Sequence, residues 1–166
     1  GDLGGAGLDI DGTRFVMSSR QKDTVGALYV TDLAALHRGA PDISLAVGGS
    51  QNLLLRAGPD HAGAFYLLAG TTGGTSPGLP IPGTGLVAPL NPSAYLTLSI
   101  AMPGPPIIGP SGFLDEFGRA DAAFSLPPAT SPGLAGVSAH HAYALFELPE
   151  LDAVFVSNAV AVELTP

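Results

Sequence analysis

The chain has 166 residues, 46% of them hydrophobic, and a net charge of −8 with only six Lys and Arg residues. This length suits one ordinary domain with its own core, and the composition argues against disorder. The shortage of cations argues against binding to nucleic acid or to an anionic membrane surface. The absence of Cys excludes disulfides and Cys-based metal sites, and no apolar run is long enough for a membrane span.

The N-terminal part, residues 1–40, predicts a glycine-rich arm followed by a β-hairpin. Residues 1–7 (GDLGGAG) have the composition of a flexible arm. Residues 8–20 carry alternating apolar positions around an Asp-Gly turn, and residues 26–33 form a second β-rich run. The chain begins at Gly1, which we interpret as a removed leader or as a piece of a longer protein.

Residues 41–166 predict an all-β domain, because short apolar runs stop repeatedly at Gly and Pro. A short helical turn is expected just before it, over residues 33–37, and residues 103–111 contain too much Pro for a central strand. A turn at DEFGR is expected to pair the following strand back onto the preceding one. The expected strands are residues 43–47, 52–56, 64–69, 86–90, 94–102, 120–126, 137–148 and 154–164. With the hairpin this makes about nine or ten strands, which is typical of an antiparallel β-sandwich of the jelly-roll or Ig-like type.

A family resemblance covers residues 43–166. The segments AGPDHAG, GTSPGLP, LNPSAY, LDEFGRA and HHAY…SNAV resemble a C-terminal domain of large secreted proteins of planctomycete-type bacteria. The resemblance implies a β-sandwich-like module located outside the cytoplasm. It implies no catalytic residues.

A second, shorter resemblance covers residues 11–33. The pattern DGTRFVMSSR…GALYVTDL is similar to the first two strands of a blade in WD40-like, TolB-type propellers. A complete blade has four strands, and a two-stranded hairpin is marginal in water. We therefore expect this hairpin to pack on the sandwich or on another copy of the chain.

Three histidines, His61, His140 and His141, are candidate metal ligands. His140 and His141 are adjacent, so on a strand they point to opposite faces and cannot hold one metal from the same side. His61 lies in a turn beside Asp60 and would have to meet one of them. The simpler interpretation, that His61 stabilises its loop, is the one we prefer.

Asp9 and Asp11, followed by Gly12, resemble the start of a calcium loop. The twelfth position counted from Asp9 is Arg20, a cation where such a loop needs Glu. An ordinary Asp-Gly turn is the preferred interpretation, and no cofactor is expected, with calcium as the alternative.

No set of residues assembles a nucleophile, a base and an orienting group. Asp115, Glu116 and Asp121 lie around a predicted turn at Gly118, where Asp115 is expected to cap the turn rather than act as an acid or base. Tyr66, Tyr95 and Tyr143 are expected in strands as core residues, whereas exposed tyrosines would favour stacking on sugars.

These observations favour a non-enzymatic, extracellular or cell-surface structural module that associates with copies of itself, as in a fibre or surface layer. The alternatives are an accessory module that binds polysaccharide or calcium, and a C-terminal surface-retention domain of a larger secreted protein. Residues 71–85 form a loop long for a passive connection, so a contact with a neighbouring chain is expected there.

Overall fold

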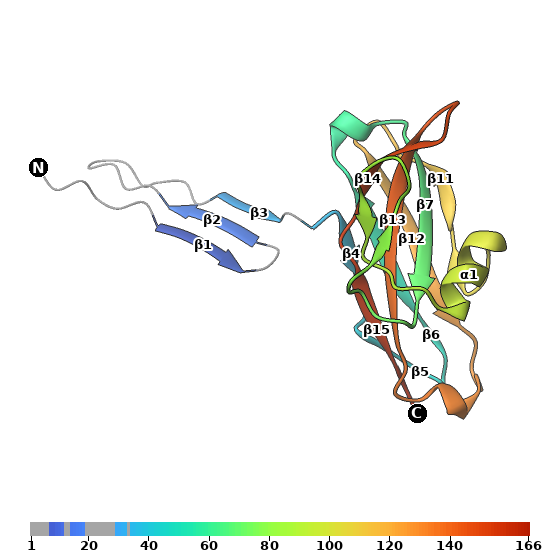
Figure 1. The fold of residues 1–166 in the computed structure, drawn as a ribbon. Coiled ribbons are helices and arrows are strands. Elements are labelled where there is room, and N and C mark those ends of the chain that lie inside the picture. Colours follow the sequence, from blue (N-terminus) through green and yellow to red (C-terminus); the bar gives the residue numbers. More distant parts are fainter. Residues whose placement is uncertain (1–6, 12–13, 19–28, 33) are drawn as a thin grey trace, which may run out of the picture. The chain divides into compact units, whose positions relative to one another are not determined.

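The computed structural model describes residues 7–11, 14–18, 29–32 and 34–166 (Figure 1). The chain divides into two compact units, Gly1–Ala34 and Ala35–Pro166, and each is described by itself. Strands dominate both units, so the all-β prediction is confirmed at this level.

The first unit contains a three-stranded antiparallel sheet in the order β1-β2-β3. Asp11 pairs with Arg14 across β1 and β2, and Met17 pairs with Tyr29 across β2 and β3. The expected hairpin is therefore part of a sheet with one more strand. Residues 1–6 of the arm predicted over residues 1–7, and residues 19–28 between β2 and β3, lie outside the described residues, whereas Gly7 begins β1. The strands are β1 (Gly7–Asp11), β2 (Arg14–Ser18) and β3 (Tyr29–Asp32).

The second unit contains two larger sheets and one small one. The four-stranded sheet has the order β10-β12-β6-β4, formed by β4 (Leu36–Arg38), β6 (Gly49–Arg56), β10 (Ile107–Ile108) and β12 (Arg119–Leu126). The six-stranded sheet has the order β11-β7-β13-β15-β5 with β14 beside β13, formed by β5 (Asp42–Ser44), β7 (Phe65–Thr71), β11 (Ser111–Phe113), β13 (Ser138–Glu147), β14 (Asp152–Val156) and β15 (Val160–Thr165). The remaining elements are the hairpin of β8 (Leu79–Pro80) and β9 (Val87–Ala88), the helix α1 (Ala94–Ala101), and the 3-10 turns η1 (Pro59–His61) and η2 (Pro132–Leu134).

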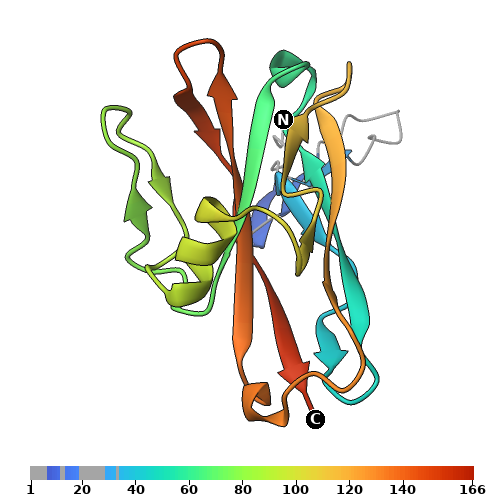
Figure 2. The same ribbon diagram turned by 90° about the vertical axis from the view of Figure 1, so that its right-hand side faces the viewer.

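Both larger sheets contribute to one hydrophobic core. Leu53 and Leu55 of β6 are fully buried, as are Leu68 of β7 and Leu145 of β13. The neighbouring positions of β7 and β13 belong to a second apolar cluster that contains Ala69, Leu90, Leu96 and Ala142. The six-stranded sheet is therefore covered on both faces. Figure 2 shows the β8–β9 hairpin on its side away from the four-stranded sheet, and α1 lies beside β7, with Leu96 in the second cluster and Tyr95 packed against the main core.

The predicted strand at residues 94–102 is wrong, because most of this segment is the helix α1. The Ser93 hydroxyl accepts a hydrogen bond from the Leu96 N–H at 3.0 Å, which is an N-cap. Leu96 and Ser99, three residues apart, are both buried. The alternation of apolar and polar residues was compatible with a strand, but the cap and this spacing fit a helix.

Two further expectations are corrected. Residues 36 and 37 of the helical turn expected over residues 33–37 belong to the strand β4, which pairs with β6. Residues 120–126 do not pair back onto residues 113–114, because β12 pairs with β6 while β11 pairs with β7 in the other sheet. One pair, β5 with β15, is parallel, in contrast to the purely antiparallel prediction.

The expected lack of a central strand at residues 103–111 is confirmed, since β10 and β11 are short strands at sheet edges. Within the described residues no helix combines the length and the apolar character needed to cross a membrane.

Candidate functional site

Among the residues whose burial the structure describes, 34–166, the most buried ionisable one is His141 of β13, and it contacts Tyr95 of α1. The Tyr95 hydroxyl and His141 Nε2 are 2.9 Å apart and share a hydrogen bond. The imidazole also packs on the Phe124 ring at 4.8 Å between centroids. Gly70 lies against this pair, because a Cβ at Gly70 would meet the Tyr95 ring and would approach His141 Cδ2 to 2.8 Å.

Burial determines the charge of this pair. It lowers the pKa of His141 from 6.5 to about 4, and the neighbouring His140 adds to the decrease. Burial also raises the pKa of the Tyr95 hydroxyl. The His141 side chain is 0% exposed, and its Nδ1 has no hydrogen-bond partner within the described part of the chain. A neutral imidazole without contact with solvent is suited to holding α1 on the sheet rather than to exchanging protons with a substrate.

The structure does not bring the three candidate histidines together. His61 lies in η1, where its ring packs on Phe155 at 5.2 Å, beside an open depression that Phe146 and Glu147 also line. His141 lies five positions before Phe146 on β13, which at about 3.3 Å per residue is more than 15 Å along the strand. No group of three or more metal-ligating side chains occurs in the part of the chain that the structure describes.

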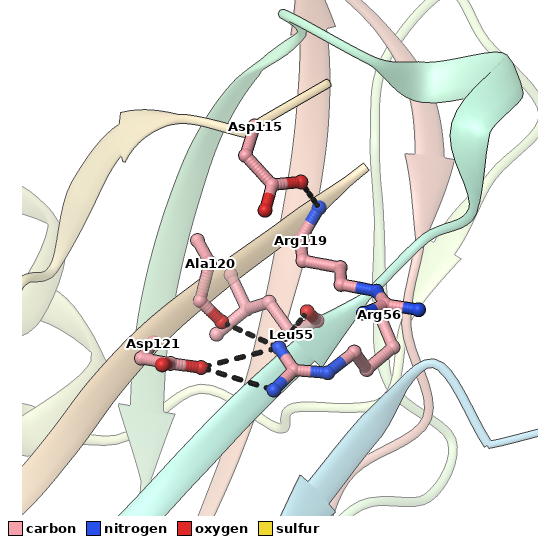
Figure 3. Close-up of polar contacts among 6 residues, drawn as sticks. All are labelled: Leu55, Arg56, Asp115, Arg119, Ala120 and Asp121. Atoms are coloured by element: carbon pink, nitrogen blue, oxygen red, sulfur yellow. Dashed lines mark hydrogen bonds and ion pairs between the residues drawn. The ribbon is translucent and has the colours of Figure 1, made fainter. Parts of the chain in front are cut away.

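Two of the carboxylates around Gly118 accept hydrogen bonds, Asp115 from backbone N–H groups and Asp121 from the Arg56 guanidinium (Figure 3). Asp115 Oδ1 accepts hydrogen bonds from the Phe117 and Arg119 N–H groups at 2.9 and 2.8 Å, so its predicted role as turn cap is confirmed. Asp121 Oδ1 accepts from both terminal nitrogens of Arg56, each at 3.1 Å. The Arg119 guanidinium lies over the Phe117 ring, 5.5 Å from its centroid. Asp115, Glu116 and Asp121 are all exposed, a setting that does not favour acid–base catalysis.

We expect Asp115→Ala to lower the free energy of unfolding by about 1 kcal/mol, because two backbone N–H groups lose their acceptor at an exposed turn. Urea denaturation measures the effect. Glu116→Ala, at the exposed neighbouring position, is the matched control and should change stability by less than about 0.5 kcal/mol. Equal losses in the two variants would contradict the assigned cap.

The calcium alternative at Asp9 and Asp11 stays a prediction. Both residues belong to β1, where Asp9 pairs with Val16 and Asp11 with Arg14. The side chains of this strand lie outside the described ones, as does Gly12.

The burial of the three candidate tyrosines decides whether their rings could stack on a sugar. Tyr66 and Tyr143 lie in strands and belong to the core, as predicted, so their rings are not available for stacking on a sugar. Tyr95 is largely buried, but in a helix instead of a strand. Burial raises the pKa of Tyr143 to about 12, and its hydroxyl donates to the Ala35 carbonyl at 3.2 Å.

The loop at residues 71–85 is organised by one side chain. Asn91 Nδ2 donates to the Gly73 and Ser76 carbonyls at 2.9 and 2.7 Å, and Asn91 Oδ1 accepts from the Gly78 N–H at 2.9 Å. The end of this segment forms β8, which pairs with β9. The loop is therefore a structured hairpin over the sheet, and the expected contact with a neighbouring chain stays a prediction.

A cavity of about 270 Å³ lies where this hairpin and α1 cover the six-stranded sheet. We call it the outer-face cavity. Its floor includes Ala69 of β7 with Ala142 and Ala144 of β13, and its walls include Leu79 and Ile100. Sequence reasoning missed it. Strands β7 and β13 carry apolar residues on both faces, and this pattern is typical of a sheet covered on both sides.

No family model matches the chain, and no curated protein matches it. The resemblances to a planctomycete-type secreted domain and to a propeller blade therefore remain predictions.

Proposed function

We propose that this protein is a non-enzymatic structural module that associates with copies of itself through its strands and loops. The observation that carries the proposal is the sheet of the first unit. Among the described residues, β1 and β3 each pair only with β2, so each presents one open edge. Open edges of this kind accept further strands from another chain.

The size of the first unit supports the need for a partner. A unit of 34 residues buries too little apolar surface to be stable alone, and disulfides are not available because the chain has no Cys. Strand addition would pair the open backbone groups of the edge and would bury more of the sheet. A second copy of the chain offers matching strands.

The surface of the second unit also favours association. Helix α1 exposes Leu98 and Ile100, and its C-cap Met102 is exposed as well, whereas the outer face of a surface helix is usually polar. Phe113 on the edge strand β11 and Ile108 on the edge strand β10 are exposed as well. Exposed apolar side chains of this size are common at protein contacts.

The ionisable side chains that could take part in catalysis support a non-enzymatic role. His141 is buried and neutral, Asp115 caps a turn, and Asp121 pairs with Arg56. Each of these three side chains contacts its own fold: His141 contacts Tyr95, Asp115 accepts backbone N–H groups, and Asp121 pairs with Arg56.

The type of β-fold and the cellular location of the protein are part of the same proposal. We interpret the two larger sheets around their common core as a β-sandwich of the jelly-roll or Ig-like type. The extracellular or cell-surface location, as part of a bacterial filament or surface layer, rests on the resemblance of residues 43–166 to secreted planctomycete-type domains.

The test compares two Thr→Lys variants of the full chain. Thr31 lies in the open edge strand β3, where a Lys should oppose strand addition, whereas Thr97 is exposed on α1. We expect the wild-type protein and Thr97→Lys to form assemblies at high concentration, and Thr31→Lys to stay smaller. Light scattering and negative-stain electron microscopy measure the sizes.

A wild-type protein that stays monomeric at high concentration would rule out self-association. Equal assembly of the two variants would rule out the edge of β3 as the contact.

A further inference from the structure

The outer-face cavity has an apolar lining contributed by strands β7, β8, β9, β13 and β14 and by the helix α1. Its floor is the outer face of β7 and β13, and its walls come from the β8–β9 hairpin and α1. The space exists because three residues of the floor, Ala69, Ala142 and Ala144, have small side chains. Larger residues surround them, among them Leu79, Leu96 and Phe146. None of the lining side chains is charged.

The one lining residue with a polar side chain is Tyr143. Its hydroxyl donates to the Ala35 carbonyl and its ring belongs to the main core on the other face of the sheet. The cavity therefore presents hydrocarbon to its occupant. A ligand with a charged or hydrogen-bonding group in the cavity would lose its hydration there without compensation.

The backbone around the cavity is already paired. Strands β7 and β13 pair with each other from Thr71 and His140 to Phe65 and Phe146, and β8 pairs with β9. A peptide in the cavity would bury N–H and C=O groups that find no partner, which is unfavourable for each group left unpaired. A hydrocarbon chain has no such groups, so the paired backbone favours a chain over a peptide segment.

The hairpin that walls the cavity is held by its own hydrogen bonds. Asn91 fixes its base through Gly73, Ser76 and Gly78. At its tip the Thr84 hydroxyl donates to the Ile81 carbonyl at 3.0 Å and accepts from the Leu86 N–H at 3.1 Å. The wall is therefore pre-organised at a distance from the sheet, and the space does not depend on a ligand to form.

Size and charge restrict the ligand further. A volume of about 270 Å³ exceeds the cavity of ~150 Å³ that suffices for benzene. The absence of a lining cation and the net charge of −8 disfavour an anionic headgroup. We propose that the outer-face cavity binds the hydrocarbon chain of a neutral amphiphile, with the headgroup left in solvent. This proposal does not depend on self-association.

The test is displacement of a neutral apolar fluorophore, N-phenylnaphthylamine, from the full-length protein by decanol, butanol and decanoate. The chain contains no Trp, so no indole emission overlaps with that of the fluorophore. We expect decanol to displace the fluorophore at concentrations at least about tenfold lower than butanol, because more hydrocarbon is buried. Decanoate should be weaker than decanol at neutral pH.

Filling the cavity provides the matched comparison. Ala144→Phe places a ring over the cavity floor, and Ala123→Phe makes the same change on β12, which does not line the cavity. We expect Ala144→Phe to weaken decanol binding at least about tenfold, and Ala123→Phe to leave it within about twofold. If Ala144→Phe fails to fold, as judged by circular dichroism, Ala88→Leu on β9 is the smaller filling variant and should weaken decanol binding more than Ala123→Phe does.

Several results would overturn the proposal. These are absence of fluorophore binding to the wild-type protein, equal binding by folded Ala144→Phe and Ala123→Phe proteins, or tighter binding of decanoate than of decanol. Dissociation of a wild-type oligomer by Ala144→Phe without any change in decanol binding would identify a second copy as the occupant instead.

Discussion

Replacing Asn158 with Ala is expected to lower the free energy of unfolding by about 3 kcal/mol, because three buried or half-buried backbone groups lose a partner. Asn158 Oδ1 accepts from the Ala35 and Leu36 N–H groups, both at 2.9 Å, and Nδ2 donates to the Leu36 carbonyl at 2.9 Å. One amide therefore ties the start of the second unit to the segment between β14 and β15, more than 120 residues later in the chain.

The matched control is Asn52→Ala. Asn52 is exposed on β6, and its replacement should cost less than about 0.5 kcal/mol. Urea denaturation followed by circular dichroism gives both values. A loss of similar size in the two variants would contradict the anchoring role of Asn158.

Lowering the pH from about 6.5 to 4 is expected to destabilise the folded protein by about 3 kcal/mol through His141 alone. The folded-state pKa is lowered to about 4, whereas the unfolded imidazole titrates near 6.5. Between these values the unfolded state binds a proton that the folded state does not, so stability falls as the pH falls. Well above pH 6.5 the residue is neutral in both states and contributes no pH dependence.

The measurement is the free energy of unfolding as a function of pH for the wild-type protein and for His141→Gln. The variant should lose this part of the slope, even if it is less stable at neutral pH. Tyr95→Phe is the control, because it removes the hydroxyl but keeps the imidazole buried, and burial is the main cause of the lowered pKa. Equal slopes in the wild-type protein and His141→Gln would contradict the buried, neutral assignment.

Local signals were sufficient where neighbouring residues determine the structure. The strand at residues 64–69 was predicted from one apolar run between turn residues, and β7 covers Phe65–Thr71. The cap by Asp115 was predicted because an Asp before a Gly-containing turn readily accepts from nearby N–H groups. Tyr66 and Tyr143 were assigned to the core because large rings in apolar strands are usually buried.

The segment at residues 94–102 illustrates where a local pattern was ambiguous. Its alternation fits a strand, and Ser93 fits the N-cap of a helix equally well. Contacts of Tyr95 with His141 and of Ser99 with Gly70 decide in favour of the helix, and both partners lie far away in the sequence. The alternation of apolar and polar residues over positions 94–102 contains no information about those contacts.

By itself the sequence determined that the chain is rich in β-strands and that Asp115 caps a turn, since propensity and short-range hydrogen bonds act over a few residues. Only the tertiary structure decided that β12 pairs with β6 instead of β11, that His141 is neutral, and that a cavity lies between β7, β13, α1 and the β8–β9 hairpin. The physical reason is that strand pairing, desolvation and cavity shape depend on residues brought together from distant parts of the chain.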